Sequence, residues 1–263
     1  MILLLILLIL VIAVLLYKHF FWKADPWPEG GLKPPSYQGH RGYWKGGAQE
    51  NSLASFKAAK ERGLQMVEMD VRLSKDGHVV VFHDDDLKRI IGDARRVEDV
   101  TAAELERIAN IPTLREVLLS KDVPPFLNIE LKTNKSTDRS LEAKVVRVIH
   151  ETESASRILF SSFNPLAIRE LHRLLPKVPR ALLATKEKDP TNRWYLKLLV
   201  LAPYIHANIL HLDHRFVSTE DLRKYVKRGI PVSFWTVNEQ SRADELLANG
   251  AQSIISDTLV PKV

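Results

Sequence analysis

The sequence predicts an α/β protein, specifically a (β/α)8 TIM barrel preceded by one N-terminal transmembrane helix. Three observations support this fold class. From residue 36 to the end of the 263-residue chain, short apolar runs alternate with amphipathic helical stretches, which indicates a parallel sheet with helical crossovers. Polar and charged residues repeatedly follow the apolar runs, at the strand ends where barrel active sites lie. The first 22 residues are almost wholly apolar.

Residues 1–22 are expected to form a single-pass membrane anchor. Residues 1–16 carry no charged or polar side chain, and the aromatic run at 20–22 with Lys18 and Lys23 extends the segment toward the roughly 20 residues that cross a bilayer. A cleaved signal peptide is the alternative, but no basic residue precedes the apolar run and no small-x-small cleavage site follows it. The flanking lysines favour a cytoplasmic location for the rest of the chain.

Residues 23–35 are expected to be a short linker, because their prolines and glycines cannot sustain a helix. Residues 36–263 show no internal break in composition and are long enough for one large domain. Amphipathic periodicity within this domain predicts helices at residues 52–62, 140–150, 164–175, 218–228 and 240–249.

Nine apolar runs are candidate strands, one more than a closed eight-stranded barrel needs. The third run follows the second through only residues 74–77, Ser-Lys-Asp-Gly, which favours an antiparallel hairpin because a parallel neighbour needs a long crossover. Residues 71–114 are therefore expected to be an insertion after strand 2. A doubly wound open sheet is the alternative, but its Gly-rich phosphate loop is absent. The runs are residues 37–40, 66–70, 78–82, 126–131, 157–161, 181–184, 209–212, 232–237 and 253–256.

Charge and composition narrow the range of partners. The formal net charge is +6 and the sequence pI is about 9.4, which suits an anionic lipid surface or a phosphate-bearing ligand. Basic residues are scattered among acidic ones, which argues against nucleic acid. The chain has no cysteine, so disulfides and a thiol nucleophile are excluded. No GxSxG, HExxH or Walker sequence is present, which removes the commonest hydrolase and NTPase sites.

Three carboxylates are candidate ligands of a divalent metal ion. Glu68 and Asp70 are two residues apart on a predicted strand, so both side chains face the barrel interior. Two buried carboxylates are very costly unless a cation compensates them. Glu130, on the next barrel strand, would complete a site for Mg²⁺ or Ca²⁺. The alternative is an acidic pair exposed on an edge strand.

Two histidines are candidates for proton transfer. His40 ends the first strand between Gly39 and Gly42, which predicts room for a substrate beside the backbone. His83 ends the apolar run of the insertion, and Asp84 after it either orients the imidazole or begins an exposed turn.

Further residues are candidates for binding substrate. Arg41 and Lys132 are expected to hold a phosphate, although Lys132 also fits a surface strand position. Glu50 and Asn51 immediately precede the helix expected from Ser52, so either they face substrate or support the residues that do, or Asn51 simply caps that helix. Trp235 would form a wall of a substrate pocket unless it is only core. A divalent ion, two imidazoles and two cations together predict a metal-assisted phosphodiester site.

The ordered motifs resemble the glycerophosphodiester phosphodiesterase family over essentially all of residues 36–263. The resemblance implies a barrel of the phosphatidylinositol-specific phospholipase C-like type with the insertion after strand 2. The motifs that carry it are His40-Arg41-Gly42, Glu50-Asn51-Ser52, Glu68-Met69-Asp70-Val71, Asp76-Gly77 through Phe82-His83-Asp84, Asn128-Ile129-Glu130-Leu131-Lys132, Ser161-Ser162-Phe163, Trp235-Thr236-Val237-Asn238 and Ile254-Ile255-Ser256-Asp257.

The family resemblance also implies an activity, the hydrolysis of a glycerophosphodiester to glycerol 3-phosphate and an alcohol. It implies that the three carboxylates bind one divalent ion. His40 would deprotonate the attacking hydroxyl or water, and His83 would protonate the leaving alcohol. Arg41 and Lys132 would contact the phosphate, and Glu50 occupies a matching motif position. The apolar N-terminus is similar to that of membrane-bound members that cleave lysophospholipids as a lysophospholipase D.

Three other functions are compatible with parts of the sequence. A different phospholipid phosphodiesterase could use the same barrel. A membrane-tethered phospholipid-binding module without activity would need no competent catalytic residues. A glycosidase could use Glu68 and Glu130 as a carboxylate pair, and it would remain active in a metal chelator.

Overall fold

The protein is described here from a computed structural model, in which residues 2–133, 137–189 and 192–261 are placed. Residue 1 of the expected anchor and residues 262–263 of the expected domain lie outside the described residues.

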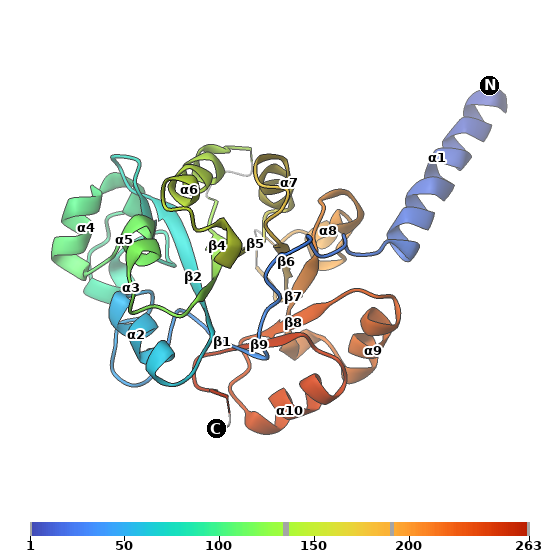
Figure 1. Ribbon diagram of the computed structural model, residues 1–263. Helices are drawn as coiled ribbons and strands as arrows, with labels where there is room; N and C mark the ends of the chain where they lie inside the picture. Colours follow the sequence, from blue (N-terminus) through green and yellow to red (C-terminus); the bar gives the residue numbers. More distant parts are fainter. Residues whose placement is uncertain (1, 134–136, 190–191, 262–263) are drawn as a thin grey trace.

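Eight parallel strands close into a barrel (Figure 1). The first strand, β1, pairs with the last strand, β9, on one side and with β2 on the other, so the sheet has no open edge within the barrel. This confirms the predicted fold class and excludes the open sheet. In order around the barrel the strands are β1 (Tyr37–Gly39), β2 (Met66–Leu73), β4 (Phe126–Leu131), β5 (Ile158–Ser162), β6 (Arg180–Ala184), β7 (Ile209–Asp213), β8 (Val232–Trp235) and β9 (Ser253–Ser256).

The ninth strand, β3 (Val79–Val81), lies outside the barrel and pairs antiparallel with the end of β2. The hairpin opens an excursion with its own small apolar core, which includes Phe82, Leu87 and Leu105. Within it are α3 (Lys88–Ile91), the 3-10 turn η1 (Val97–Asp99) and α4 (Ala102–Ala109). The chain then returns through α5 (Leu114–Leu119) to β4.

Five longer helices cover the outside of the barrel, close to the predicted ranges. They begin at side-chain caps where the sequence supplies them: Ser52, Asn164 and Ser218 each accept a backbone N–H of the first turn. The helices are α2 (Leu53–Glu61), α6 (Ser140–Glu151), α7 (Pro165–Leu174), α9 (Thr219–Lys227) and α10 (Gln240–Ala248). Short elements complete the chain: η2 (Ala155–Arg157), α8 (Trp194–Lys197), η3 (Ala202–Tyr204) and η4 (His214–Phe216).

The N-terminal helix α1 (Ile2–Phe21) projects away from the barrel, and none of its residues is buried (Figure 1). Its length and hydropathy suffice to cross a membrane, and an N-terminal signal sequence can have the same length and hydropathy. Its last turn touches the barrel domain, where the Lys18 ammonium lies 5.4 Å from the Tyr204 ring centroid.

The linker packs against the base of the barrel, at the N-terminal ends of the strands. Leu32 is buried in a cluster with the inward-facing side chains of Met66 and Ile209, and Trp27 packs on the same cluster. The backbone of Ser36 accepts a hydrogen bond from Ile254 of β9 at 2.8 Å. The segment expected as a tether therefore closes the bottom of the barrel, because it carries apolar side chains between its prolines.

Candidate active site

Three acidic side chains converge inside the barrel near its mouth. Glu68 and Asp70 come from β2, and Glu130 comes from β4, where it is the register partner of Asp70. All three side chains are buried, and one oxygen from each lies within 4.8 Å of the others. Hard oxygen ligands at this spacing fit one Mg²⁺ or Ca²⁺ ion. The alternative of an acidic pair exposed on an edge strand is excluded, because β2 pairs with β1 and β4 as one strand of the closed barrel.

The electrostatics of this carboxylate trio favour a bound cation. Burial raises the pKa of Glu68 well above its usual value, and the charges of Asp70 and Glu130 raise it further. Burial also raises the pKa of Glu130. For Asp70 burial acts in the same direction, but the positive charge of Lys132 and smaller contributions outweigh it, so its pKa lies below the usual range. The Oε1 atom of Glu68 is buried without a hydrogen-bond partner among the described residues, which fits an oxygen that ligates a metal ion.

Asn51 positions Asp70, which the sequence left undecided. Its amide nitrogen donates to Oδ2 of Asp70 at 2.8 Å, and its carbonyl oxygen accepts from the Asp70 backbone N–H at 3.2 Å. The helix cap is the next residue, Ser52. Asn51 has a left-handed backbone, with φ of 55°, which Asn tolerates better than most residues.

The two predicted phosphate anchors both reach the carboxylates. The Lys132 ammonium contacts Glu130 and lies 3.2 Å from Oδ1 of Asp70. Burial acts to lower the pKa of Lys132, but these two carboxylates outweigh it and the pKa is raised. Arg41 places Nε 3.3 Å from Asp70 and Nη1 2.9 Å from Glu50. The Lys132 side chain is therefore mostly buried, at 15% exposure, and paired with carboxylates, which does not fit an exposed surface strand position.

His40 directly follows β1, and its ring is held by a carboxylate to which the sequence assigned no role. Its Nδ1 lies 2.8 Å from Oδ1 of Asp257, whose other oxygen accepts from the Asn238 side chain at 2.9 Å. Burial opposes ionisation of Asp257, but the hydrogen bond from His40 and smaller contributions outweigh it and lower the pKa of Asp257. The other ring nitrogen, Nε2, lies 4.0 Å from Glu68. The ring thus faces the carboxylate trio.

His83 is held in the same way on the excursion. Its Nδ1 lies 2.6 Å from Oδ1 of Asp84, which confirms the orienting contact rather than an exposed turn. Arg89 donates to the other oxygen of Asp84 at 2.6 Å. Burial lowers the pKa of His83 to about 4, although the nearby Asp70 charge opposes this shift. Its ring is therefore mainly neutral at pH 7.

Glu50 connects two arginines. It accepts from Arg41 at 2.9 Å and from the two terminal nitrogens of Arg89 at 2.9 and 2.5 Å. Burial opposes ionisation, but the Arg89 hydrogen bond and smaller contributions keep the pKa of Glu50 low. Among the described residues, Glu50 does not line the cavity above the carboxylates. Its contacts hold the Arg41 and Arg89 side chains in position. Arg89 had no distinguishing signal in the sequence.

A cavity of about 680 Å³ opens over these groups. Its lining includes both histidines, Arg41, Lys132 and two of the carboxylates. The lining also includes apolar side chains, among them Leu183, Leu196 and Trp235, and further polar ones such as Glu187 and Asn192. The Trp235 ring is fixed by a hydrogen bond from Nε1 to the His211 carbonyl at 3.1 Å and by edge-to-face contact with Phe163. Trp235 therefore lines this cavity with its ring held in place.

Gly39 and Gly42 serve packing, which differs from the expected role. A Cβ on Gly42 would lie 2.4 Å from Oγ of Ser55, and Gly42 has a φ of 86°. A Cβ on Gly39 would lie 2.9 Å from the Gly42 carbonyl oxygen. The glycines therefore let the turn after β1 press against α2, and they open no space for substrate.

Comparisons with known proteins agree with this geometry. The model of the glycerophosphoryl diester phosphodiesterase family matches residues 39–260. A glycerophosphodiester phosphodiesterase of Caldanaerobacter subterraneus subsp. tengcongensis is 30% identical over 231 residues, which cover 83% of this chain and 92% of the relative. A human lysophospholipase D is 26% identical over 268 residues, covering 83% of this chain and 82% of the relative.

Solved structures show the same barrel. A phosphodiesterase from Oleispira antarctica, in complex with the product sn-glycerol-3-phosphate, superposes with a TM-score of 0.73 at 29% identity. The match covers 85% of this chain and 93% of that one.

Proposed function

The chain belongs to the glycerophosphoryl diester phosphodiesterase family and is a phosphoric diester hydrolase, and we propose that one divalent ion held by Glu68, Asp70 and Glu130 is required for its reaction. The observation that carries this proposal is the convergence of three buried carboxylates, one of them with an unpartnered oxygen, beside two oriented histidines. Glycerophosphodiesters are the proposed substrates, and glycerol 3-phosphate and an alcohol are the products.

The residues divide the work of the reaction. Glu68, Asp70 and Glu130 would hold one divalent ion, which would supply Lewis-acid polarisation of the phosphate and would offset the carboxylate charge. Arg41 and Lys132 line the cavity and bind the phosphate. His40, held by Asp257, removes the proton from the attacking hydroxyl or water, and His83, held by Asp84, protonates the leaving alcohol. The low pKa of the free His83 ring means that the substrate's negative charge has to favour its protonated form.

Metal removal tests the proposal. We expect EDTA to abolish release of glycerol 3-phosphate from glycerophosphocholine, and excess Mg²⁺ or Ca²⁺ to restore it. Glu130→Gln should need more metal for half-maximal activity, because it removes one charged ligand. Exposed Glu116→Gln on α5 is the matched control and should behave as the unaltered protein. Turnover that persists in chelator would contradict the metal assignment.

We propose further that the enzyme accepts lysophospholipids, which it splits into lysophosphatidate and the head-group alcohol. Three features support this. Apolar side chains, including Leu183 and Leu196, contribute to the lining of the cavity. Leu196 lies in α8, and large apolar side chains beside it are exposed. Trp194, the first residue of α8, is 67% accessible, and Leu198, the residue after α8, is 58% accessible. The human relative is named a lysophospholipase D.

Product analysis tests the substrate range. The full chain is incubated in detergent with a panel of deacylated and singly acylated phospholipids, and products are identified by mass spectrometry. We expect glycerol 3-phosphate from the deacylated members and lysophosphatidate from the acylated ones. Cleavage of deacylated substrates alone would contradict lysophospholipid activity while leaving glycerophosphodiester hydrolysis in place.

We also propose that α1 is retained as a membrane anchor with the barrel in the cytoplasm. Because the chain has no cysteine, one introduced cysteine reports topology without background. Lys57→Cys, at an exposed position of α2, should react with an impermeant maleimide only after the cells are lysed. Labelling of intact cells, or recovery of a protein that lacks residues 1–22, would contradict the proposal.

A further inference from the structure

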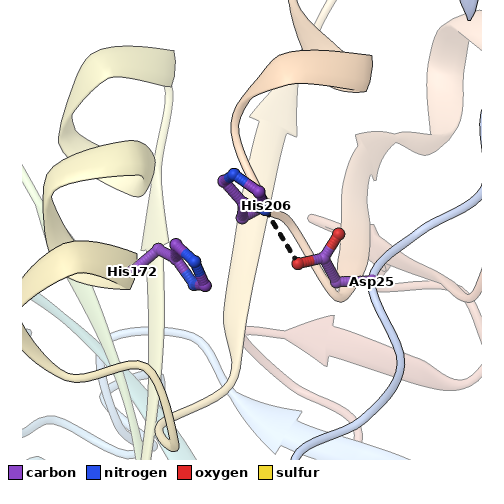
Figure 2. Close-up of side chains that lie close together, drawn as sticks. All are labelled: Asp25, His172 and His206. Atoms are coloured by element: carbon purple, nitrogen blue, oxygen red, sulfur yellow. Dashed lines mark hydrogen bonds and ion pairs between the residues drawn. The ribbon is translucent and has the colours of Figure 1, made fainter.

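A second cluster of side chains that could hold a metal ion consists of three residues that are distant in sequence (Figure 2). Asp25 comes from the linker, His172 from α7, and His206 from the residues before β7. One ligand atom from each lies within 4.8 Å of the others. The two imidazole rings stack with centroids 4.1 Å apart, and Nδ1 of His206 lies 3.1 Å from the Asp25 carboxylate.

The donor set matches a different metal class from that of the active site. Two imidazoles and one carboxylate suit zinc and related transition ions, whereas three carboxylates suit magnesium and calcium. Nδ1 of His172 is buried and has no hydrogen-bond partner among the described residues. A buried ring nitrogen without a partner is costly, and a metal ion would satisfy it.

The backbones that carry these side chains are held in place. Arg180 donates from Nε to the His206 carbonyl at 3.0 Å, and Asn208 donates to the Pro26 carbonyl at 2.8 Å. The Asp25 amide donates at 2.9 Å to the carbonyl of the residue before Asn208. His206 has a φ of 61°, a left-handed conformation that persists only where its surroundings impose it. The linker and the segment before β7 are therefore preorganised relative to each other.

Side-chain freedom and charge decide whether an ion can enter. The stacked rings must turn about their side-chain torsions to aim one nitrogen each at a single ion, and the His206 side chain, 48% exposed, has room to turn. The charges of Arg180 and Lys177 oppose a cation, and the carboxylates of Asp25 and Glu29, which line the same cleft of about 490 Å³, balance them. The cleft also admits water as a further ligand.

We propose that Asp25, His172 and His206 bind one divalent ion of the zinc class, which fastens the linker to the base of the barrel. The ion joins a segment that directly follows α1 to two segments of the barrel wall. It therefore sets how the barrel is held relative to the N-terminal helix. This role is independent of the hydrolytic reaction.

Metal binding to the full chain in detergent tests the proposal. Metal-free protein is dialysed against micromolar Zn²⁺ with excess Mg²⁺, which competes for the carboxylate trio. We expect Asp25→Asn and His206→Gln to bind one equivalent fewer than the unaltered protein, and Co²⁺ absorption bands of a histidine-ligated ion to weaken in both variants. Exposed His78→Gln is the matched control. Unchanged stoichiometry and spectra in both variants would overturn the proposal and leave a simple ion pair.

Proteolysis gives a second readout that does not depend on activity. Lys23 is exposed and stands two residues before Asp25. Zn²⁺ should slow tryptic cleavage after Lys23 at least several-fold in the unaltered protein and have no effect in Asp25→Asn. Because Asp25 lies in the linker, this variant leaves the barrel core intact, and its thermal unfolding in EDTA should match that of the unaltered protein. Equal protection by Zn²⁺ in both proteins would contradict the proposal.

Discussion

At the scale of single residues, each proposed catalytic histidine is oriented by a carboxylate that is itself held in place. Asn238 holds Asp257 against His40, and Arg89 holds Asp84 against His83. An imidazole bound at Nδ1 presents Nε2 on its opposite edge, and the carboxylate fixes the tautomer. The two rings approach the substrate from different elements, β1 and the excursion, which suits one proton acceptor and one proton donor.

We expect His40→Ala and His83→Ala each to lower kcat by about 10²-fold or more, because general acid–base catalysis contributes that much. Asp257→Asn should lower kcat less and leave KM nearly unchanged, because it misorients His40 without touching substrate. Release of glycerol 3-phosphate measures all three. His78→Ala, on the exposed hairpin turn, is the control, and thermal unfolding should show that every variant is folded. A variant with unaltered kcat would remove that residue from the mechanism.

Asn51 offers a test of metal positioning. Removing its side chain in Asn51→Ala frees Asp70 to move, so we expect the metal concentration for half-maximal activity to rise about 10- to 100-fold. Asn110→Ala is a close control, because Asn110 has nearly the same left-handed backbone, with φ of 50°, at the end of α4. Both variants lose a residue suited to the left-handed backbone, but of the two asparagines only Asn51 donates a hydrogen bond to Asp70, a proposed metal ligand. Equal metal dependence in the two variants would show that Asn51 acts on folding alone.

Part of the candidate site could be inferred from the sequence and part could not. The carboxylate trio and both histidines stand at strand ends with distinctive neighbours, so local pattern predicted that they would meet. Asp257 also stands at a strand end, but only the closure of β9 onto β1 brings it to His40. Arg89 lies on a four-residue helix of the excursion, and no periodicity places such a helix against Glu50.

At the scale of elements, the strand count and the short turn between β2 and β3 sufficed to predict the barrel and its excursion. Sequence periodicity did not predict α4 of the excursion or α5, which leads back to the barrel. Both helices nevertheless have capping residues: Thr101 caps α4, and α5 begins with the capping box of Thr113 and Glu116. These helices have six to eight residues, too short for periodicity to distinguish them from loop. The caps were the available signal.

The α8 segment carries a testable preference between substrates. Trp194 and Leu198 are exposed beside Leu196, which lines the cavity. Replacing both by Ala removes apolar surface that would otherwise enter a lipid phase, at about 1.5–3 kcal/mol per side chain. We expect the double variant to lose about 10-fold or more in kcat/KM for lysophosphatidylcholine in vesicles and to keep its activity on glycerophosphocholine.

Leu119→Ala with Leu166→Ala is the matched control for the α8 variant. Both leucines are exposed, at 58% and 41%, on helices outside α8. This control should retain both activities. An equal loss on the two substrates in the α8 variant would indicate damage to the site, and no loss on either would remove α8 from substrate recognition.

At the scale of the whole molecule, the barrel is closed at one end and open at the other. Linker residues Leu32 and Trp27 cover the base, whereas the mouth holds the charged groups. Between them lies a polar middle layer, in which Asn128 donates to Gln38 at 3.1 Å and accepts from Ser161 at 2.9 Å. This layer gives the carboxylates a rigid floor.

His211 lies in the same interior and makes stability depend on pH. It is fully buried on β7, its register partners are Leu183 and Ser233, and neither ring nitrogen has a partner among the described residues. Burial lowers the pKa of His211 from 6.5 to about 3. Between these values the unfolded chain binds a proton that the folded chain does not, so the contribution of His211 is complete above pH 6.5 and is lost as pH falls toward 3.

His211→Leu stays neutral at every pH, and it therefore isolates this contribution from those of the carboxylates. We expect urea unfolding to show that the variant's free energy of unfolding, relative to the unaltered protein, rises as pH falls from 7 to 5, with a slope approaching about 1.4 kcal/mol per pH unit. The change in packing is the same at each pH and cancels in the slope. His78→Gln, at an exposed position, should leave the pH dependence unaltered. A constant difference between His211→Leu and the unaltered protein over this range would show that the buried imidazole takes up a proton in the folded barrel, and would place an unseen partner beside it.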